Sequence, residues 1–334
     1  MDYIKVLSEQ EKIELFDVLS SVTANPYLNY LSFENQINNL IEQEKIPYFF
    51  KETCQNIIED RAKGQAAHVL KNCPIDLDFK LTDHNNPYQQ KLNNKNTFIG
   101  ESLLSVFSKL LDNPLLSYNN RFDGSFFADV FSWNQFNGHD SQFGDTELAL
   151  HNDRTAHDVR ADFTTLLGIN CPEKELIFTS FIDGRDILKH LTSEEEEILR
   201  QPLFYTEFDI HSKQTTKNLV QSKQHPLIEE SHCIRYRDGW TSVGKTNDPI
   251  VKDAFIAFIR ALSRAEKQYH RLLKGDLFVF ANQQGLHSRT HMEINNPLEA
   301  KKRWLLKTYS FESMQTAKKF SNRYVIDKFG CVND

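Results

Sequence analysis

Two histidines and one aspartate in this chain have the residue types of a metal site. His151 and Asp153 are two positions apart in the run ALHND, and on a strand over residues 148–153 both side chains would leave the sheet on one face. The pattern is weak alone, because 12 histidines and 46 acidic residues in 334 give about 1.7 His-x-acid matches by chance. The only other match, at residues 291–293, lies too near the C-terminus to be followed by a distant third ligand. We therefore expect the third ligand to be His287, in GDLFVFANQQGLHSR.

This ligand set has the composition of a mononuclear iron site. Two histidines and one carboxylate on one face of an iron leave coordination positions open for a co-substrate and O2. Each motif lies beside an apolar, strand-like run, and Arg303 follows His287 by sixteen residues on another such run, RWLLKTYSF. A guanidinium can bind a carboxylate through two parallel hydrogen bonds. The alternative for His151 and Asp153 is a polar strand end without a metal.

Four segments together carry a family resemblance. The HND motif at 151–153, the following RADFTTLLGINCP, the GDLFVFANQQGLHSR run and KKRWLLKTY resemble the clavaminate synthase-like branch of the Fe(II)/2-oxoglutarate oxygenases, over about residues 64–311. Many members of that branch hydroxylate free amino acids at unactivated carbons, and the likeness is closest to bacterial enzymes that hydroxylate free L-lysine. The resemblance implies Fe(II) bound by His151, Asp153 and His287, with 2-oxoglutarate and O2 as co-substrates.

The resemblance also implies roles for residues outside the metal site. Arg303 would receive the far carboxylate of 2-oxoglutarate, and Thr179 matches a threonine whose hydroxyl binds the same molecule, although it could be an ordinary strand threonine. Ser141, ten residues before His151, matches a position that helps to hold the substrate backbone. Lys307 stands where related enzymes have a second arginine for the substrate α-carboxylate, and lysine offers a point charge without the planar fork.

Asp238, in HCIRYRDGW, lies where related enzymes place acidic residues against a basic substrate side chain. A carboxylate shielded from water would bind an ammonium or guanidinium group and disfavour a neutral side chain, which would leave it unpaired. The alternative is a turn residue before Gly239. Asp153 disfavours halogenation, because related halogenases lack this carboxylate and bind chloride in its place.

The sequence thus predicts an Fe(II)/2-oxoglutarate-dependent dioxygenase that hydroxylates a free basic L-amino acid, with L-lysine and its fourth carbon as the first choice. One alternative is an arginine or ornithine hydroxylase of the same family. Another is a zinc-dependent hydrolase with the same three ligands, although zinc gives no reason for Arg303 to follow the distal histidine. A third is a non-catalytic jelly-roll binding protein.

Composition limits the partners and the compartment. The net charge is −7 without a long Lys/Arg block, so nucleic acid is not expected. No apolar run approaches 18 residues and the first residues lack an apolar core, which predicts a cytoplasmic protein without a membrane partner. The five cysteines are scattered, without a CxxC pair, and are expected to be free thiols. A small-molecule amino acid is the expected partner, and no oligomeric state follows from the sequence.

Hydrophobic periodicity predicts the elements that must position these residues. Ser8 and Glu11 form a predicted capping box at the start of the first helix. Residues 81–96 read as loop, and 122–147 read as a strand followed by a long irregular loop. Further helices are expected from Ser32, from Tyr48, and within 100–113, 191–202 and 248–269; strands are expected near 66–71, 148–153 and 175–183, and over 275–282, the last delivering His287.

Strands in the middle of the chain, bracketed by helices and with both metal motifs at strand ends, predict an α+β fold. The expected core is a double-stranded β-helix of the jelly-roll or cupin type, flanked by helices. We expect one domain over 1–334, with an N-terminal helical portion (1–63), a core (64–311) and a C-terminal extension (312–334). A lid-like segment is expected to be inserted in the core at about 205–250.

Overall fold

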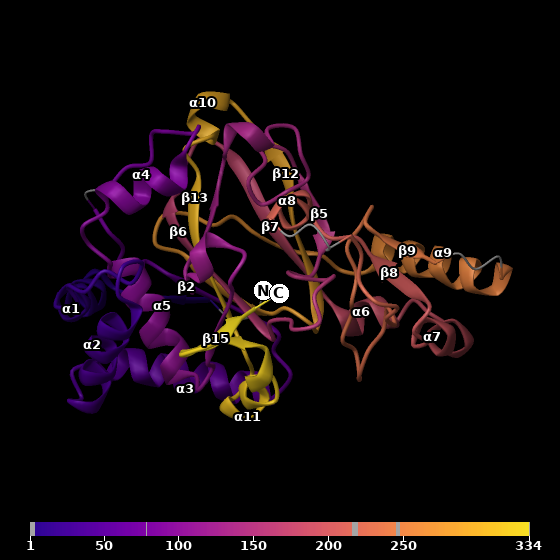
Figure 1. Ribbon diagram of the computed structural model, residues 1–334, viewed down its shortest axis with the longest axis horizontal. Coiled ribbons are helices and arrows are strands. Elements are labelled where there is room, and N and C mark those ends of the chain that lie inside the picture. The colour runs from indigo at the N-terminus through magenta and orange to yellow at the C-terminus, as the bar shows by residue number, and fades with distance from the viewer. Residues whose placement is uncertain (1–3, 78, 216–219, 245–247, 334) are drawn as a thin grey trace.

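The computed structural model describes residues 4–77, 79–215, 220–244 and 248–333, and its strands form two large sheets (Figure 1). The larger sheet has the order β1-β2-β11-β6-β13-β3-β15-β14, with β4 also paired to β13, and the smaller has the order β10-β7-β12-β5. The strands of the larger sheet are β1 (Ile4–Val6), β2 (Ala67–Lys71), β3 (Leu115–Tyr118), β4 (Ala128–Phe131), β6 (Phe163–Asn170), β11 (Leu277–Ala281), β13 (Trp304–Ser310), β14 (Tyr324–Val325) and β15 (Lys328–Val332). Those of the smaller are β5 (Leu148–His151), β7 (Leu176–Asp183), β10 (Gln268–His270) and β12 (Gly285–Glu293).

The two sheets face each other across a hydrophobic cluster. Leu166 of β6, Phe280 of β11 and Leu305 of β13 come from the larger sheet, and Phe181 of β7 comes from the smaller one. The ring centroids of Phe181 and Phe280 are 5.7 Å apart. The mixed helix and strand content confirms the predicted α+β class, and two facing sheets are consistent with a double-stranded β-helix.

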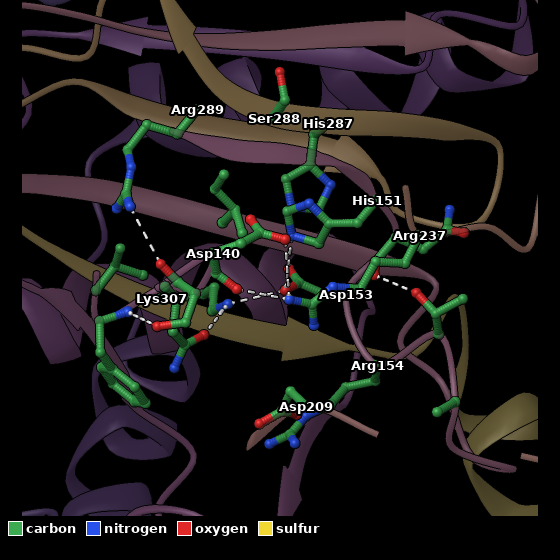
Figure 2. A pocket seen from close by; sticks show the side chains of 18 of the residues that line it. Asp140, His151, Asp153, Arg154, Asp209, Arg237, His287, Ser288, Arg289 and Lys307 are labelled. Atoms are coloured by element: carbon green, nitrogen blue, oxygen red, sulfur yellow. Dashed lines mark hydrogen bonds and ion pairs between the residues drawn. The ribbon is translucent and has the colours of Figure 1, made fainter. Parts of the chain in front are cut away.

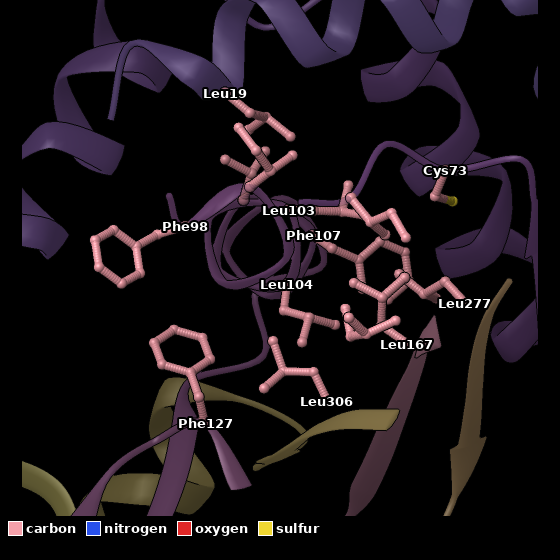
Figure 3. Packing of buried hydrophobic residues seen from close by; sticks show 14 of the residues in the cluster. Leu19, Cys73, Phe98, Leu103, Leu104, Phe107, Phe127, Leu167, Leu277 and Leu306 are labelled. Carbon is pink, nitrogen blue, oxygen red and sulfur yellow. The ribbon is translucent and has the colours of Figure 1, made fainter. Parts of the chain in front are cut away.

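Helices cover the outer face of the larger sheet, where α5 is the central element. The helices of this half are α1 (Glu9–Ser20), α2 (Tyr30–Glu42), α3 (Tyr48–Ala62), α4 (Pro87–Asn94) and α5 (Ile99–Leu110). Figure 3 shows α5 between Leu19 of α1 on one side and Leu167 and Leu306 of the sheet on the other. Because side chains alternate along a strand, Leu306 packs on this helical layer while Leu305 and Lys307 face the inter-sheet space.

A second group of helices packs against the smaller sheet. Phe258 of α9 and Leu199 of α7 share a cluster with Ile182 of β7 and Leu286 of β12. The remaining helices are α6 (Gly184–Leu188), α7 (Ser193–Leu199), α8 (Ile210–Thr215), α9 (Pro249–Arg264), α10 (Pro297–Ala300) and α11 (Met314–Lys318), and the short strands β8 (Phe204–Thr206) and β9 (Thr241–Val243) form a separate pair. None of the described helices is long and apolar enough to cross a membrane.

Most predicted elements are confirmed, with two differences outside the site. The Ser8 and Glu11 capping box is present and all five cysteines are free. The prediction of loop over 81–96 is wrong, because α4 begins at Pro87, whose ring suits the first turn of a helix. In the C-terminal extension, β15 pairs in parallel with β3, so this segment forms part of the larger sheet.

Helix α4 is held by a charge inside the protein, which leads to a stability prediction. The Lys91 ammonium forms an ion pair with Asp129, and both side chains are fully buried. Substitution Lys91→Met should lower the free energy of unfolding by about 3–5 kcal/mol, because it leaves the Asp129 carboxylate buried without a cation. Chemical denaturation measures this change. The control Lys189→Met removes an exposed ion pair with Asp186 and should leave the unfolding midpoint unaltered; equal midpoints for both variants would contradict the prediction.

The inserted segment partly covers the space between the sheets. It contains β8, α8 and β9, and residues 206–210 line the same pocket as the predicted metal ligands. Residues 216–219 and 245–247 of the predicted lid-like segment lie outside the described residues. That the segment acts as a lid stays a prediction.

A buried histidine in this insertion predicts a loss of stability in acid. His225 is 3% exposed, with Nδ1 2.7 Å from the Pro226 carbonyl oxygen and Nε2 2.9 Å from the Thr206 hydroxyl. Burial, aided by Arg235, lowers the pKa of His225 from 6.5 to about 3. The unfolded chain therefore binds a proton that the folded chain does not, and stability falls as pH drops from about 6.5 towards 3.

Urea unfolding at pH 7 and pH 5 tests this prediction. Each pH unit below the ordinary pKa costs up to about 1.4 kcal/mol per such histidine. The wild type should therefore lose up to about 2 kcal/mol more than a His225→Asn variant between these two pH values. Equal losses in the two proteins would show that His225 does not cause the acid sensitivity.

Candidate active site

The structure brings the three predicted metal ligands together at one end of the smaller sheet. Strands β5 and β12 pair antiparallel with His151 directly opposite His287, and the two imidazole centroids are 4.1 Å apart. Asp153 Oδ1 lies 4.0 Å from His151 Nε2, and Oδ2 lies 3.5 Å from His287 Nε2. One ligand atom from each residue falls within 4.8 Å of the other two. Figure 2 shows the three side chains pointing toward a common centre.

The elements that carry Asp153 and His287 differ from the ones predicted. Strand β5 ends at His151, so Asp153 lies in the following turn rather than on the same strand face. Strand β11 ends at Ala281, and His287 lies on the next strand, β12, in the other sheet. The prediction that the 275–282 strand delivers His287 directly is therefore wrong. Residues 282–284 connect β11 in the larger sheet to β12 in the smaller sheet, where His287 lies.

Two buried asparagines hold the turn that carries Asp153. The Asp153 backbone N–H donates to Asn282 Oδ1 at 2.8 Å, and Asn282 Nδ2 donates to the Asp153 carbonyl oxygen at 3.2 Å. Asn152 Nδ2 donates to the carbonyl oxygens of Asn282 and Gly285, at 2.7 and 2.8 Å. These bonds tie the two metal-bearing segments together. Sequence reasoning missed both asparagines, because an Asn beside a strand end is also the ordinary signal of a turn.

The electrostatics of the three residues suit a divalent cation. Burial lowers the pKa of His151 to about 4 and the pKa of His287 well below its usual range. Burial alone would raise the pKa of Asp153, but Lys307 and the two histidines outweigh it and hold that pKa below its usual range. Two neutral imidazoles and an ionised carboxylate are the protonation states that metal binding requires. The Nδ1–H of His151 donates to the Ala149 carbonyl oxygen at 2.7 Å, which leaves Nε2 for the metal.

Arg303 provides a buried cation in the same pocket. Its side chain is only 8% exposed and lines the cavity with the metal ligands. Among the described residues no carboxylate pairs with its guanidinium, and Nε lacks a hydrogen-bond partner. A buried charge without a counter-ion is costly, so the site is suited to a ligand that brings a carboxylate. Thr179 of β7, which is buried, lines the same cavity.

Of the three predicted substrate residues, two line the pocket and one does not. Ser141 lines the pocket, and its hydroxyl oxygen accepts from the Phe143 backbone N–H at 3.1 Å. Lys307 also lines the pocket, where Nζ donates to Asp153 Oδ1 at 3.0 Å and to Gln142 Oε1 at 2.9 Å. Asp238 is exposed, accepts a hydrogen bond from the Tyr236 hydroxyl at 2.8 Å, and is not among the residues that line the pocket. Asp238 thus lies outside the pocket that the predicted metal ligands line, and its role as a substrate anchor stays a prediction.

The pocket is also lined by charged residues that sequence reasoning did not identify. Arg121 forms an ion pair with Asp209, 88 positions along the chain. Arg237 lies 3.6 Å from Asp140, whose Oδ2 also accepts from the Trp240 indole N–H at 3.2 Å. The four charged residues lie in segments without periodicity, and only the packing brings them into the lining of the pocket.

Comparison with known proteins agrees with this geometry. Residues 100–309, more than half of the chain, match the family described as taurine catabolism dioxygenase TauD, TfdA family. A comparison with curated proteins finds no match.

Solved structures show the same fold. An asparagine oxygenase in complex with Fe(II), (2S,3S)-3-hydroxyasparagine and succinate superposes with a TM-score of 0.79, at 18% identity over 99% of both chains. The non-heme iron oxygenase OrfP with Fe and α-ketoglutaric acid gives 0.77, at 16% identity over 99% of both chains. OrfP with Fe, succinate and (3R,4R)-dihydroxy-L-Arg gives 0.79 with the same identity and coverage.

The ligand set and the family match lead to one chemistry. His151, Asp153 and His287 could supply the donors for Fe(II), and Arg303, which has no carboxylate partner among the described residues, is suited to the free carboxylate of 2-oxoglutarate. Fe(II) is the metal, and 2-oxoglutarate and O2 are the co-substrates. The chain belongs to the taurine catabolism dioxygenase TauD, TfdA family and is a 2-oxoglutarate-dependent Fe(II) dioxygenase.

Proposed function

We propose that this dioxygenase hydroxylates an unactivated carbon of a free amino acid. The observation that carries the proposal is the single pocket in which the three metal ligands, the unpaired Arg303 and the loop residue Ser141 meet. The metal ligands are at most 7% exposed, so the pocket favours a small substrate over a polymer. Structures of the same fold hold hydroxyasparagine in the asparagine oxygenase and hydroxylated arginines in OrfP. The family match argues against the zinc hydrolase and the non-catalytic binding protein.

Four pocket residues besides the metal ligands have a role in this scheme. Arg303 and Thr179 hold 2-oxoglutarate beside the metal, and Arg303 neutralises its far carboxylate. When bound, iron and 2-oxoglutarate together activate O2, so that the co-substrate leaves as succinate and CO2 and one oxygen atom enters the substrate. Ser141 and Lys307 hold the backbone of the amino acid. The carbon that is hydroxylated is then set by its distance from the metal.

We propose that the substrate is an amino acid with a basic side chain. The first candidate is L-lysine, hydroxylated at its fourth carbon. Three carboxylates line the pocket besides the metal ligand, namely Asp140, Glu207 and Asp209. Each of them already has a cation of the protein beside it: Arg237 lies 3.6 Å from Asp140, Lys213 lies 2.6 Å from Glu207, and Arg121 pairs with Asp209. A positively charged substrate side chain would share these carboxylates with the protein's own cations. Arginine or ornithine is the second candidate, supported by the arginine derivatives bound to OrfP.

The test supplies the iron-loaded enzyme and 2-oxoglutarate with L-lysine, L-arginine, L-ornithine or L-asparagine in turn. Succinate formation and a product heavier by one oxygen atom are measured. L-norleucine is the matched control, because it keeps the carbon chain of lysine without the ammonium, and it should react at least about 30-fold less efficiently. Succinate formation that none of the four amino acids stimulates would reject the proposed function. Stimulation by L-asparagine alone would reject the basic side chain.

A further inference from the structure

Arg289 connects the metal-bearing strand to the loop over the pocket. It lies on β12 two residues after His287, and it is 9% exposed. Its Nε donates to the Thr146 carbonyl oxygen at 3.0 Å. Its Nη2 donates to the carbonyl oxygens of Ser141, Gly144 and Thr146, at 3.2, 2.9 and 2.6 Å. Figure 2 shows the side chain extending from β12 on the opposite side of His287 from Arg237.

The charge of Arg289 is stabilised at hydrogen-bond distance by the loop, and Asp140 and Asp145 favour it from further away. Within the described part of the chain no carboxylate lies within ion-pair distance of its guanidinium, and burial, followed by the nearby Arg303, lowers its pKa to about 9. Keeping a buried cation without a counter-ion costs free energy. The three backbone carbonyl groups that point at the guanidinium offset that cost, so the position of the loop and the position of Arg289 depend on each other.

The loop held in this way forms one wall of the pocket. Of residues 139–146, four consecutive ones line the cavity: Asp140, Ser141, Gln142 and Phe143. Gln142 Oε1 accepts a hydrogen bond from Lys307, which itself contacts Asp153. The loop also closes tightly on itself, because a Cβ on Gly144 would lie 2.1 Å from the His139 carbonyl oxygen. A displacement of this loop would therefore move the substrate wall relative to the metal.

We propose that Arg289 is a positioning residue that ties loop 139–146 to β12 and so sets the distance between the substrate and the metal. The proposal rests on the proposed amino-acid hydroxylation. Arg289 also lines the pocket, but in this scheme its guanidinium binds the loop carbonyl groups and neither reactant. Its effect is on coupling. With the loop held, each 2-oxoglutarate consumed gives one hydroxylated product. With the loop free, succinate forms in excess of product, and ascorbate added to the assay supplies the two electrons that reduce the unused oxygen atom to water.

The variant Arg289→Lys tests this, because lysine keeps the charge but cannot reach three carbonyl groups with a planar fork. Amide hydrogen exchange of loop residues 139–146 in the iron-loaded enzyme should accelerate by about tenfold or more. The KM for the amino acid should rise about tenfold, the KM for 2-oxoglutarate should change less than about threefold, and the ratio of succinate to product should rise. Arg200→Lys is the matched control, since Arg200 also donates to two loop carbonyl oxygens, those of Glu229 and Ser231, away from the metal site.

A second variant changes the conformation of the same loop while Arg289 stays in place. Gly144→Ala forces the loop to shift and should raise the ratio of succinate to product in the same way. Unchanged loop exchange and an unchanged ratio in Arg289→Lys would overturn the proposal, and so would a rise in the KM for 2-oxoglutarate alone, which would assign Arg289 to the co-substrate. The exchange measurement needs no amino acid, so it separates failure of this proposal from failure of the proposed function.

Discussion

Asp153→Ala is expected to reduce kcat/KM by about 1000-fold or more, which corresponds to at least about 4 kcal/mol of transition-state stabilisation. The substitution removes one of three protein ligands and the only ionised one in the set. Iron affinity should fall with it, as measured by equilibrium binding. Asp158→Ala is the matched control, because Asp158 lies five residues further on, is partly exposed and pairs with Lys223 at the surface. Turnover by Asp153→Ala at the wild-type rate would contradict the assigned metal site.

A second substitution separates loss of chemistry from loss of fold. Asp153 is the partner of the buried Lys307 ammonium, and removing one member of a buried ion pair destabilises a protein by about 3–5 kcal/mol. The double variant Asp153→Ala with Lys307→Met should therefore regain most of the thermal stability that the single variant loses, while it stays inactive. Activity restored together with stability would show that Asp153 serves the fold and not the metal.

Arg303→Met is expected to raise the KM for 2-oxoglutarate by about 30-fold or more. The guanidinium is buried and, in the described part of the chain, has no carboxylate partner, so the co-substrate would supply the counter-ion. Losing one partner of a buried charge pair costs about 2–5 kcal/mol. Steady-state kinetics with varied 2-oxoglutarate measure the change, and Lys302→Met, which alters an exposed neighbour paired with Glu299, is the control.

An analogue of 2-oxoglutarate tests whether Arg303 binds the far carboxylate. 2-Oxopentanoate keeps the keto acid but lacks the far carboxylate, so it should bind the wild type much more weakly than 2-oxoglutarate does. In Arg303→Met this difference should largely disappear, because both molecules then meet the same uncharged side chain. If the variant still prefers 2-oxoglutarate as strongly as the wild type does, another residue receives the far carboxylate.

Sequence patterns predicted much of the local structure. The capping box of α1, the amphipathic helices and the central strands follow from spacing within a few residues, which depends on the backbone geometry of the element itself. Helix α4 was missed because a polar Asn-rich run suggests a loop, and its stability comes instead from the Lys91 and Asp129 pair, 38 positions apart. A contact at that separation leaves no local signal.

The residues of the candidate site also fall into those that the sequence predicted correctly and those that it did not. Residue type, spacing and family resemblance were sufficient to select His151, Asp153, His287 and Arg303, and the structure places all four in one pocket. The same reasoning selected Asp238, which the structure leaves exposed at the surface. A motif specifies which groups are chemically able to act, but it contains no information about the direction in which a loop residue points.

The sequence alone therefore determined the ligand types and the helix and strand periodicity, because these follow from the residues themselves and from their near neighbours, and the resemblance to a family indicated the class of chemistry. Only the tertiary structure decided that Asn282 holds the turn of Asp153 across 129 positions and that Arg289 holds the loop at Ser141 across 148. It also decided that Asp140, Glu207 and Asp209 line the pocket. The physical reason is that hydrogen bonds and ion pairs between distant segments depend on how two sheets pack, and packing is a property of the whole chain.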